Sequence, residues 1–187
     1  MSRRPAFAPH ALDVASFCRD AASLQGQWPL TGLPRLAESV LPGTDAVVEW
    51  TASGATQRIG GQPRAQLHLR ARSTVALQCQ RCLQSMPQLL EVERDFHFVE
   101  GEDEAARLDE EEPEVDVLAL EPRFDLRGLI EDELLLALPL VARHGSCPEL
   151  PAELRPIAGA HEGEGAPPTE AAEHPFAALA ALRRAKT

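Results

Sequence analysis

The sequence predicts an α+β domain with an antiparallel β-sheet, a long hairpin, packed helices and a mobile C-terminal helix. Two observations carry this prediction. Residues 64–78 and 89–99 both alternate apolar and polar side chains, and the short connection between them indicates an antiparallel pair of strands. Residues 125–138 instead place their apolar side chains at helical spacing. Long strands and a strong helix in one chain of 187 residues predict a mixed domain with its own core.

The N-terminal part of the chain predicts two helices and a strand. Residues 12–24 carry an apolar stripe at helical spacing, with Asp13 as N-cap and Cys18 as a core thiol. Residues 33–40 form a second, short helix, which ends before a Pro-Gly pair. Residues 46–52 are rich in β-formers and predict a strand.

The two hairpin strands each show which side chains face the core. In the first, Leu67 and Leu69 point one way while His68 points the other. In the second, Phe96 and Phe98 share the apolar face. His68 is therefore expected to be exposed, and His97, between the two Phe residues, is expected to face away from the core.

Residues 116–120 predict a short strand, and the helix that follows it has clear ends. Asp125 is the expected N-cap and Pro139 ends the helix. The run Glu131, Asp132 and Glu133 could be imagined as catalytic acids. Three consecutive residues point in different directions on a helix, however, so a solvated helix face is the preferred interpretation.

Negative charge is concentrated in one segment. Of the formal net charge of −11, residues 100–116 carry about −9, with Arg107 as their single base, so the rest of the chain is close to neutral. Residues 100–115 are expected to form a mobile acidic loop. The chain has no Tyr and few other aromatic residues, and its sequence shows no basic patch typical of nucleic-acid readers.

The composition changes again near the C-terminus, which predicts three regions. Residues 1–154 form a single α+β domain, residues 155–173 a disordered linker, and residues 174–187 a short basic amphipathic helix that folds on a partner or against the domain. Three bases near its end are candidate partner-binding residues, with RNA phosphates or a solubilising role as the alternatives: Arg183, Arg184 and Lys186.

No apolar run is long enough to span a membrane, and no secretory leader is evident, so a cytoplasmic protein with reduced thiols or a metal is expected. Cys79 and Cys82 form a C-x-x-C in the hairpin connection, and His144 and Cys147 follow the last helix of the domain. Together they would make a Cys₃His set suited to Zn²⁺. The alternatives are small turn residues with a half-buried thiol, or a redox C-x-x-C. The redox interpretation is the weaker one, because a redox C-x-x-C opens a helix whereas Cys79 and Cys82 precede a strand.

Several segments resemble the bacterial YceD family, named for large ribosomal RNA subunit accumulation. They are STVALQCQRCLQ, DLRGLIEDELLLALPLVARHGSCPE and HPFAALAALRR, with LQGQWPLTGLPRLAES similar to the family's early segment. Cys79, Arg81 and Cys82 match its C-x-R-C motif, and His144 and Cys147 match a downstream H…C whose spacing here is shorter than in some relatives.

The resemblance implies a bacterial cytoplasmic role in synthesis, processing or stability of 23S ribosomal RNA, and it brings no catalytic residue. With the acidic charge, it predicts a non-enzymatic ribosome-biogenesis factor that binds a basic ribosomal protein or assembly factor. No membrane and no small-molecule substrate are expected. Direct RNA binding is the first alternative, favoured if folding gathers four arginines on one face: Arg64, Arg70, Arg72 and Arg81. A nuclease or redox enzyme is the second.

Overall fold

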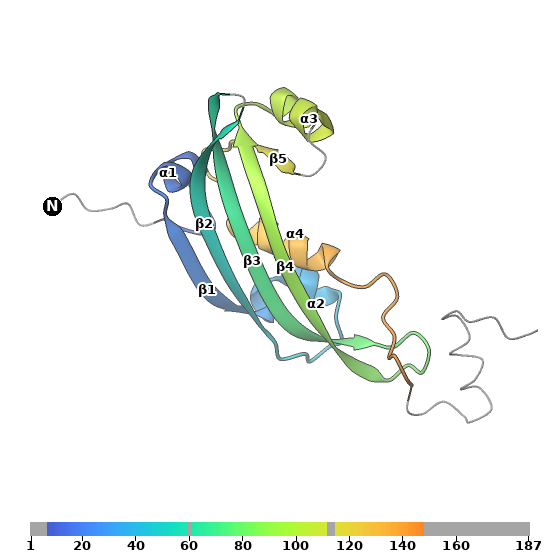
Figure 1. Ribbon diagram of the computed structural model, residues 1–187. Coiled ribbons are helices and arrows are strands. Elements are labelled where there is room, and N and C mark those ends of the chain that lie inside the picture. Colours follow the sequence, from blue (N-terminus) through green and yellow to red (C-terminus); the bar gives the residue numbers. More distant parts are fainter. Residues whose placement is uncertain (1–6, 60, 112–114, 148–187) are drawn as a thin grey trace, which may run out of the picture. The chain divides into compact units, whose positions relative to one another are not determined.

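The computed structural model describes residues 7–59, 61–111 and 115–147, which form one five-stranded sheet with helices packed on it (Figure 1). The predicted α+β class is confirmed. The predicted linker 155–173 and the C-terminal helix 174–187, with Arg183, Arg184 and Lys186, lie outside the described residues. The elements follow in the order α1 (Val14–Arg19), β1 (Ser23–Pro29), η1 (Leu30–Gly32), α2 (Pro34–Glu38), β2 (Val47–Ile59), β3 (Gln62–Gln78), β4 (Ser85–Val99), α3 (Glu102–Glu111), β5 (Asp116–Ala119) and α4 (Leu126–Leu136).

The sheet is built around the long hairpin that the sequence predicts. β3 and β4 pair antiparallel from Ala65↔Phe98 to Gln78↔Ser85, and β1 and β2 extend the antiparallel sheet beside β3. β5 pairs parallel with the end of β4. The strand order β1-β2-β3-β4-β5 therefore follows the sequence, and the segment that contains α3 forms the crossover connection between the parallel strands β4 and β5.

One face of the sheet carries the main core. Alternate side chains of the long strands, such as Leu67, Leu69 and Phe96, are at most 2% exposed. The helix α1 lies on β2 and β3, and α4 lies on β3 and β4 (Figure 1). Both predicted N-caps are present, because the Asp13 side chain accepts from the Ser16 backbone and that of Asp125 from the Arg127 backbone.

The prediction of a mobile loop over residues 100–115 is wrong, because most of that segment forms the helix α3. Ala105 and Leu108, three residues apart, are buried against Val117 of β5. Arg107 forms ion pairs with acids one turn before and one turn after it. These apolar contacts and ion pairs offset the mutual repulsion of the acidic side chains.

α3 also explains why His97, which faces away from the main core as expected, is nevertheless buried. His97 does face away from Phe96 and Phe98, but it is only 5% exposed. It pairs in register with Val117, which belongs to the small core beneath α3. α3 therefore covers this end of the sheet on the face opposite to α4, and a position that alternation assigns to solvent is buried.

The predicted helix over residues 12–24 is too long. α1 ends at Arg19, Ala21 takes a φ of 46°, and the chain then continues as β1. β1 pairs with β2 along its whole length, from Ser23↔Ser53 to Pro29↔Val47. Strand pairing with a distant segment has overridden the local helical pattern.

The solvated face predicted for the three acids of α4 is correct only for Asp132. Glu131 and Glu133 are 5% and 8% exposed. Glu131 pairs with Arg35 of the α2 segment, and Glu133 with Arg94 of β4. Because both carboxylates have cationic partners, their burial is tolerated. The two ion pairs connect α4 to α2 and to β4. Among the described residues, none of the helices has the length and hydropathy needed to span a bilayer.

Candidate metal centre

The hairpin end between β3 and β4 holds the first two candidate ligands. Cys79 follows β3 directly, and its backbone N–H donates to the Gln84 carbonyl at 2.9 Å. The Leu83 N–H in turn donates to the Cys79 carbonyl at 2.9 Å, and Leu83 takes a φ of 59°. This tight turn brings the side chains of Cys79 and Cys82 to the same side of the connection.

The segment after α4 supplies the other two ligands. It is tied to the hairpin end by the Gln80 N–H, which donates to the Ala142 carbonyl at 2.8 Å. Two residues later the His144 N–H donates to the Cys79 sulfur at 3.4 Å. These backbone contacts bring His144 and Cys147 beside cysteines that are more than sixty residues away in the chain.

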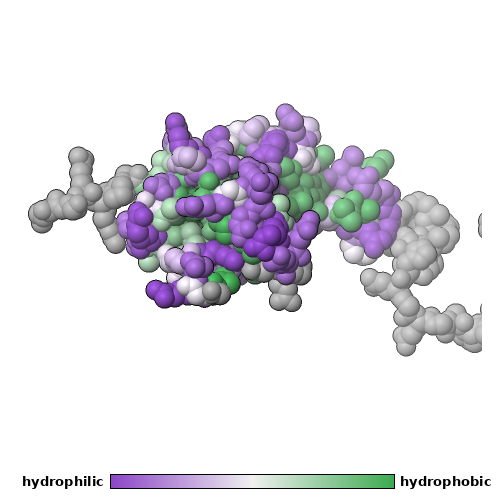
Figure 2. Space-filling model, turned by 90° about the horizontal axis from the view of Figure 1, so that it is seen from above, coloured by the Kyte–Doolittle hydropathy of each residue, from purple (hydrophilic) through white to green (hydrophobic). Residues whose placement is uncertain are grey.

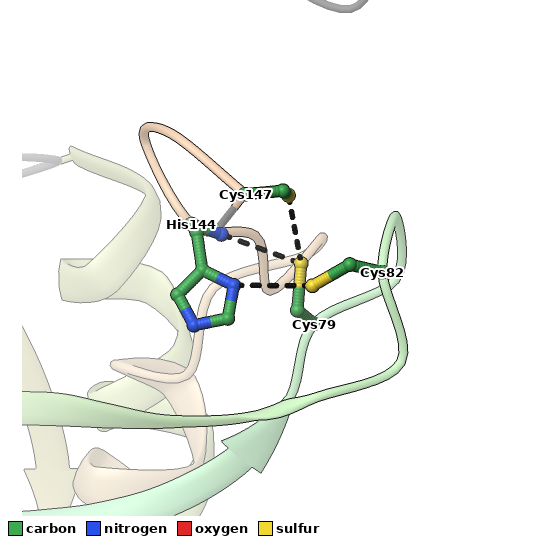
Figure 3. Close-up of side chains that lie close together, drawn as sticks. All are labelled: Cys79, Cys82, His144 and Cys147. Atoms are coloured by element: carbon green, nitrogen blue, oxygen red, sulfur yellow. Dashed lines mark hydrogen bonds between the residues drawn. The ribbon is translucent and has the colours of Figure 1, made fainter. Parts of the chain in front are cut away.

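The four ligand atoms of Cys79, Cys82, His144 and Cys147 lie within 4.8 Å of one another (Figure 3). The sulfurs of Cys79 and Cys147 are 3.7 Å apart, and the Cys82 sulfur is 3.4 Å from Nδ1 of His144. Tetrahedral Zn²⁺ with its usual bond lengths would place two sulfurs about 3.8 Å apart and a sulfur and a nitrogen about 3.5 Å apart. The donor set and these two spacings fit zinc.

The protonation of the site also fits a metal. Burial raises the pKa of the Cys79 thiol, but hydrogen bonds from the backbone of Cys82, His144 and Arg81 and from the Cys82 thiol outweigh it, and the pKa falls to about 5. Burial, with the neighbouring Cys79 and Cys82 sulfurs, raises the pKa of Cys147 to about 11. The site therefore accommodates one thiolate easily and a second one poorly, unless a cation compensates the added negative charge.

Burial indicates which chemistry the set could support. Cys79 and Cys147 are 0% and 3% exposed, and Cys82 and His144 are half-buried. Four protein ligands around one ion leave no coordination position for a substrate, which is typical of structural zinc. The C-x-x-C opens a turn that leads into β4 and not a helix, so the low pKa of Cys79 comes from nearby hydrogen-bond donors and not from a helix N-terminus as in redox motifs.

The structure thus brings together all four residues that the sequence singled out, and whether they hold zinc stays a prediction. Cys18 lies apart from them as a core thiol, 1% exposed, with its sulfur 3.1 Å from the Gln66 carbonyl oxygen. The sequence did not predict the backbone hydrogen bond from Gln80 to Ala142. A backbone hydrogen bond between distant segments does not require particular side chains, so no sequence pattern indicates it.

Comparison with known proteins identifies the family. The family model described as large ribosomal RNA subunit accumulation protein YceD matches residues 67–183, a range that contains all four candidate ligands. A curated protein of Haemophilus influenzae, named large ribosomal RNA subunit accumulation protein YceD, is 33% identical over 162 residues, which cover 85% of this chain and 86% of the relative. No solved structure matches the chain. The chain belongs to the YceD family.

Proposed function

We propose that this protein is a non-enzymatic cytoplasmic factor of ribosome biogenesis, which supports accumulation of 23S ribosomal RNA by binding a basic ribosomal protein or assembly factor. Membership of the YceD family, whose printed name refers to the large ribosomal RNA subunit, supports the connection with that RNA. The choice of a protein as direct partner rests on the charges of the described surface.

The acidic helix α3 is the observation that carries the choice. Its ten residues contain six acids and one base, Arg107, which is already paired with Glu104 and Glu111. On the face in view in Figure 2, hydrophilic side chains are interspersed with smaller hydrophobic patches. A strongly negative surface repels RNA phosphates and attracts a basic protein, and such attraction raises the association rate and selects the partner.

The alternative of direct RNA binding depends on the arginines of β3 and the hairpin end. Arg70 and Arg72 do share a face of the sheet, but each forms an ion pair at 2.5 Å, with Glu93 and Glu49 respectively. Arg81 lies apart from them, in the hairpin connection. A phosphate would have to displace a carboxylate already in place, which makes these arginines weak candidates for RNA contacts.

We further propose that the Cys₃His set holds a structural zinc ion. When bound, the ion would supply a cross-link between the hairpin end and the segment after α4. Cys79 and Cys82 would hold it from the hairpin, and His144 and Cys147 from the other side. We also keep Arg183, Arg184 and Lys186 as proposed partner contacts, since the sequence predicts that the basic helix that carries them folds on a partner or against the domain.

Co-purification tests the function directly. The full-length tagged chain is isolated at moderate salt from bacterial cells, with and without ribonuclease, beside a variant that lacks residues 174–187. We expect a basic ribosomal protein or assembly factor to remain bound after ribonuclease treatment. Absence of such a protein, together with tight and salt-sensitive binding to naked RNA, would refute the proposal. Loss of the partner only in the shortened variant would assign part of the binding to residues 174–187.

A further inference from the structure

We propose that the face of the sheet opposite to α4 binds an extended basic segment of a protein partner. This inference rests on the proposed function and names the surface that would carry it. The face is hollowed over β1 to β4, with a volume of about 960 Å³. It is called the open face below, and its central residues form two rows across the strands: Gln27, Glu49, Arg72 and Glu91 in one, Gln25, Thr51, Arg70 and Glu93 in the other.

The side chains of the open face are polar and largely matched to one another. Arg72 pairs with Glu49, and Arg70 with Glu93. Gln27 donates from Nε2 to Glu49 at 3.1 Å. Glu91 is exposed and, among the described residues, forms no ion pair, although it stands in register beside Arg72. The two arginines in these rows are therefore neutralised by carboxylates. The Glu91 carboxylate carries a negative charge that no ion pair among the described residues compensates.

These ion pairs determine whether the open face favours a positively or a negatively charged ligand. An RNA phosphate would gain an arginine only by breaking an existing ion pair, and it would face the Glu91 carboxylate. A lysine or arginine of a partner would pair with Glu91 and leave both existing pairs intact. Trp50 is the sole aromatic residue lining the hollow in the described part of the chain, and it is 4% exposed, so the face offers no stacking platform for bases.

The surroundings of the open face add to its negative field. α3 lies on this side of the sheet, since its apolar residues pack with Val117, which pairs with His97. Glu104 of α3 interacts electrostatically with Arg64, which belongs to the same face of β3 as Arg70 and Arg72. The six acids of α3 therefore lie toward one end of the open face. They lie about 20 Å along β3 from Arg70, beyond the screening length at physiological salt, so they would attract an approaching basic segment more than they would hold a bound one.

The dimensions suit an extended chain. The hollow runs across four neighbouring strands, which places its ends about 15 Å apart at the usual strand spacing. About five extended residues cover that length. A second hollow of about 440 Å³ adjoins it, sharing Gln25, Thr51 and Arg70 and adding Ser23 and Ser53. The side-chain amide of Gln25 and the hydroxyl of Thr51, which line both hollows, can form hydrogen bonds with a peptide backbone. Glu91, which lines the larger hollow, favours positively charged side chains.

The test uses the full-length, ¹⁵N-labelled protein with two probes, a twelve-residue peptide of alternating lysine and serine and a twelve-nucleotide oligouridylate. We expect the peptide to shift the amide signals of Gln25, Thr51 and Glu91 in a saturable way, and the RNA to leave them unchanged. Glu91→Lys should weaken peptide binding about fivefold, because it replaces an attraction by a repulsion. Glu38→Lys is the matched control, since Glu38 is also exposed but lies on α2, and it should bind like the unchanged protein.

Three results would overturn the inference: peptide shifts confined to α3, equal peptide binding by the two lysine variants, or RNA shifts centred on the open face. The co-purification experiment separates this failure from failure of the proposed function. If the basic partner co-purifies with Glu91→Lys as well as with the unchanged protein, the open face is not its binding site but the function stands. If no basic protein co-purifies with the unchanged chain, the proposed function itself fails.

Discussion

The Glu131 carboxylate on α4 binds both the backbone and the side chain of Arg35. Oε1 accepts from the Arg35 N–H at 2.7 Å, and Oε2 from the Arg35 Nε at 3.1 Å. Oε1 also accepts from the Leu36 N–H at 3.2 Å. α2 has no side-chain cap of its own at Leu33 and begins with Pro34, which lacks an N–H. A buried carboxylate of another helix therefore caps α2, so the acidic motif of α4 has a structural role.

Replacement of Glu131 should destabilise the domain. We expect Glu131→Ala to lower the free energy of unfolding by about 2–3 kcal/mol, because the first turn of α2 loses its cap and a charged hydrogen bond is removed. Urea unfolding measures the loss. Asp132→Ala is the matched control, since Asp132 pairs with the same arginine but is half-exposed, and it should cost less than about 1 kcal/mol. Equal losses in the two variants would contradict the capping role.

The zinc proposal predicts about one zinc ion per purified chain. Cys79→Ser and Cys82→Ser should each lose the metal, and the free energy of unfolding should fall with it because the cross-link between two distant segments is broken. Metal analysis and thermal unfolding measure both effects. Cys18→Ala provides the control, since Cys18 is buried away from the cluster, and it should keep its zinc. A metal-free protein as stable as the zinc-loaded one would contradict the proposal.

Zinc affinity should fall as the pH is lowered. The pKa of Cys147 is raised to about 11 in the metal-free site, so at neutral pH this residue must lose a proton when zinc binds. The zinc-bound state carries fewer protons, and lower pH therefore favours release. Titration against a competing chelator at pH 6, 7 and 8 should show a loss of at least about tenfold per pH unit. An affinity independent of pH would show that Cys147 is not a ligand.

Gly54 allows α1 to lie directly on β2. A Cβ atom at this position would lie 2.7 Å from Cδ1 of Phe17 and 2.9 Å from the Cα atom of Cys18. Gly54→Ala should therefore push α1 away from the sheet and cost about 1–3 kcal/mol. Gly32→Ala is the control, because its added Cβ would have Trp28 as nearest neighbour at 4.0 Å. Similar thermal unfolding of the two variants would mean that α1 accommodates the methyl group.

The helix α3 should be able to open locally without unfolding of the main core. Its buried contacts are Ala105 and Leu108 against Val117, a cluster separate from the main core. We expect Leu108→Ala to speed amide hydrogen exchange in α3 while the amides of β2 and β3 keep their protection. Arg107→Ala removes exposed ion pairs at the same helix and should have a much smaller effect. A uniform loss of protection would show that α3 unfolds only together with the whole domain.

Local periodicity was sufficient for the central elements. Alternation and helical spacing are properties of neighbouring residues, so the hairpin β3–β4, the helix α4 with its Asp125 cap and the short helix α2 could all be predicted from the sequence. It also supplied the four candidate ligands, because C-x-x-C and H-x-x-C spacings are visible without a fold.

Tertiary structure decided everything that depends on pairing between distant segments. The end of the helix predicted over residues 12–24 belongs instead to β1, because its backbone forms strand hydrogen bonds with β2. α3 formed from an acidic segment because Val117 buries its two apolar residues, and the same packing buries His97. Glu131 is buried because Arg35 and the start of α2 lie beside it. The four ligands meet because the Gln80 N–H binds the Ala142 carbonyl, a contact that joins two segments far apart in the chain.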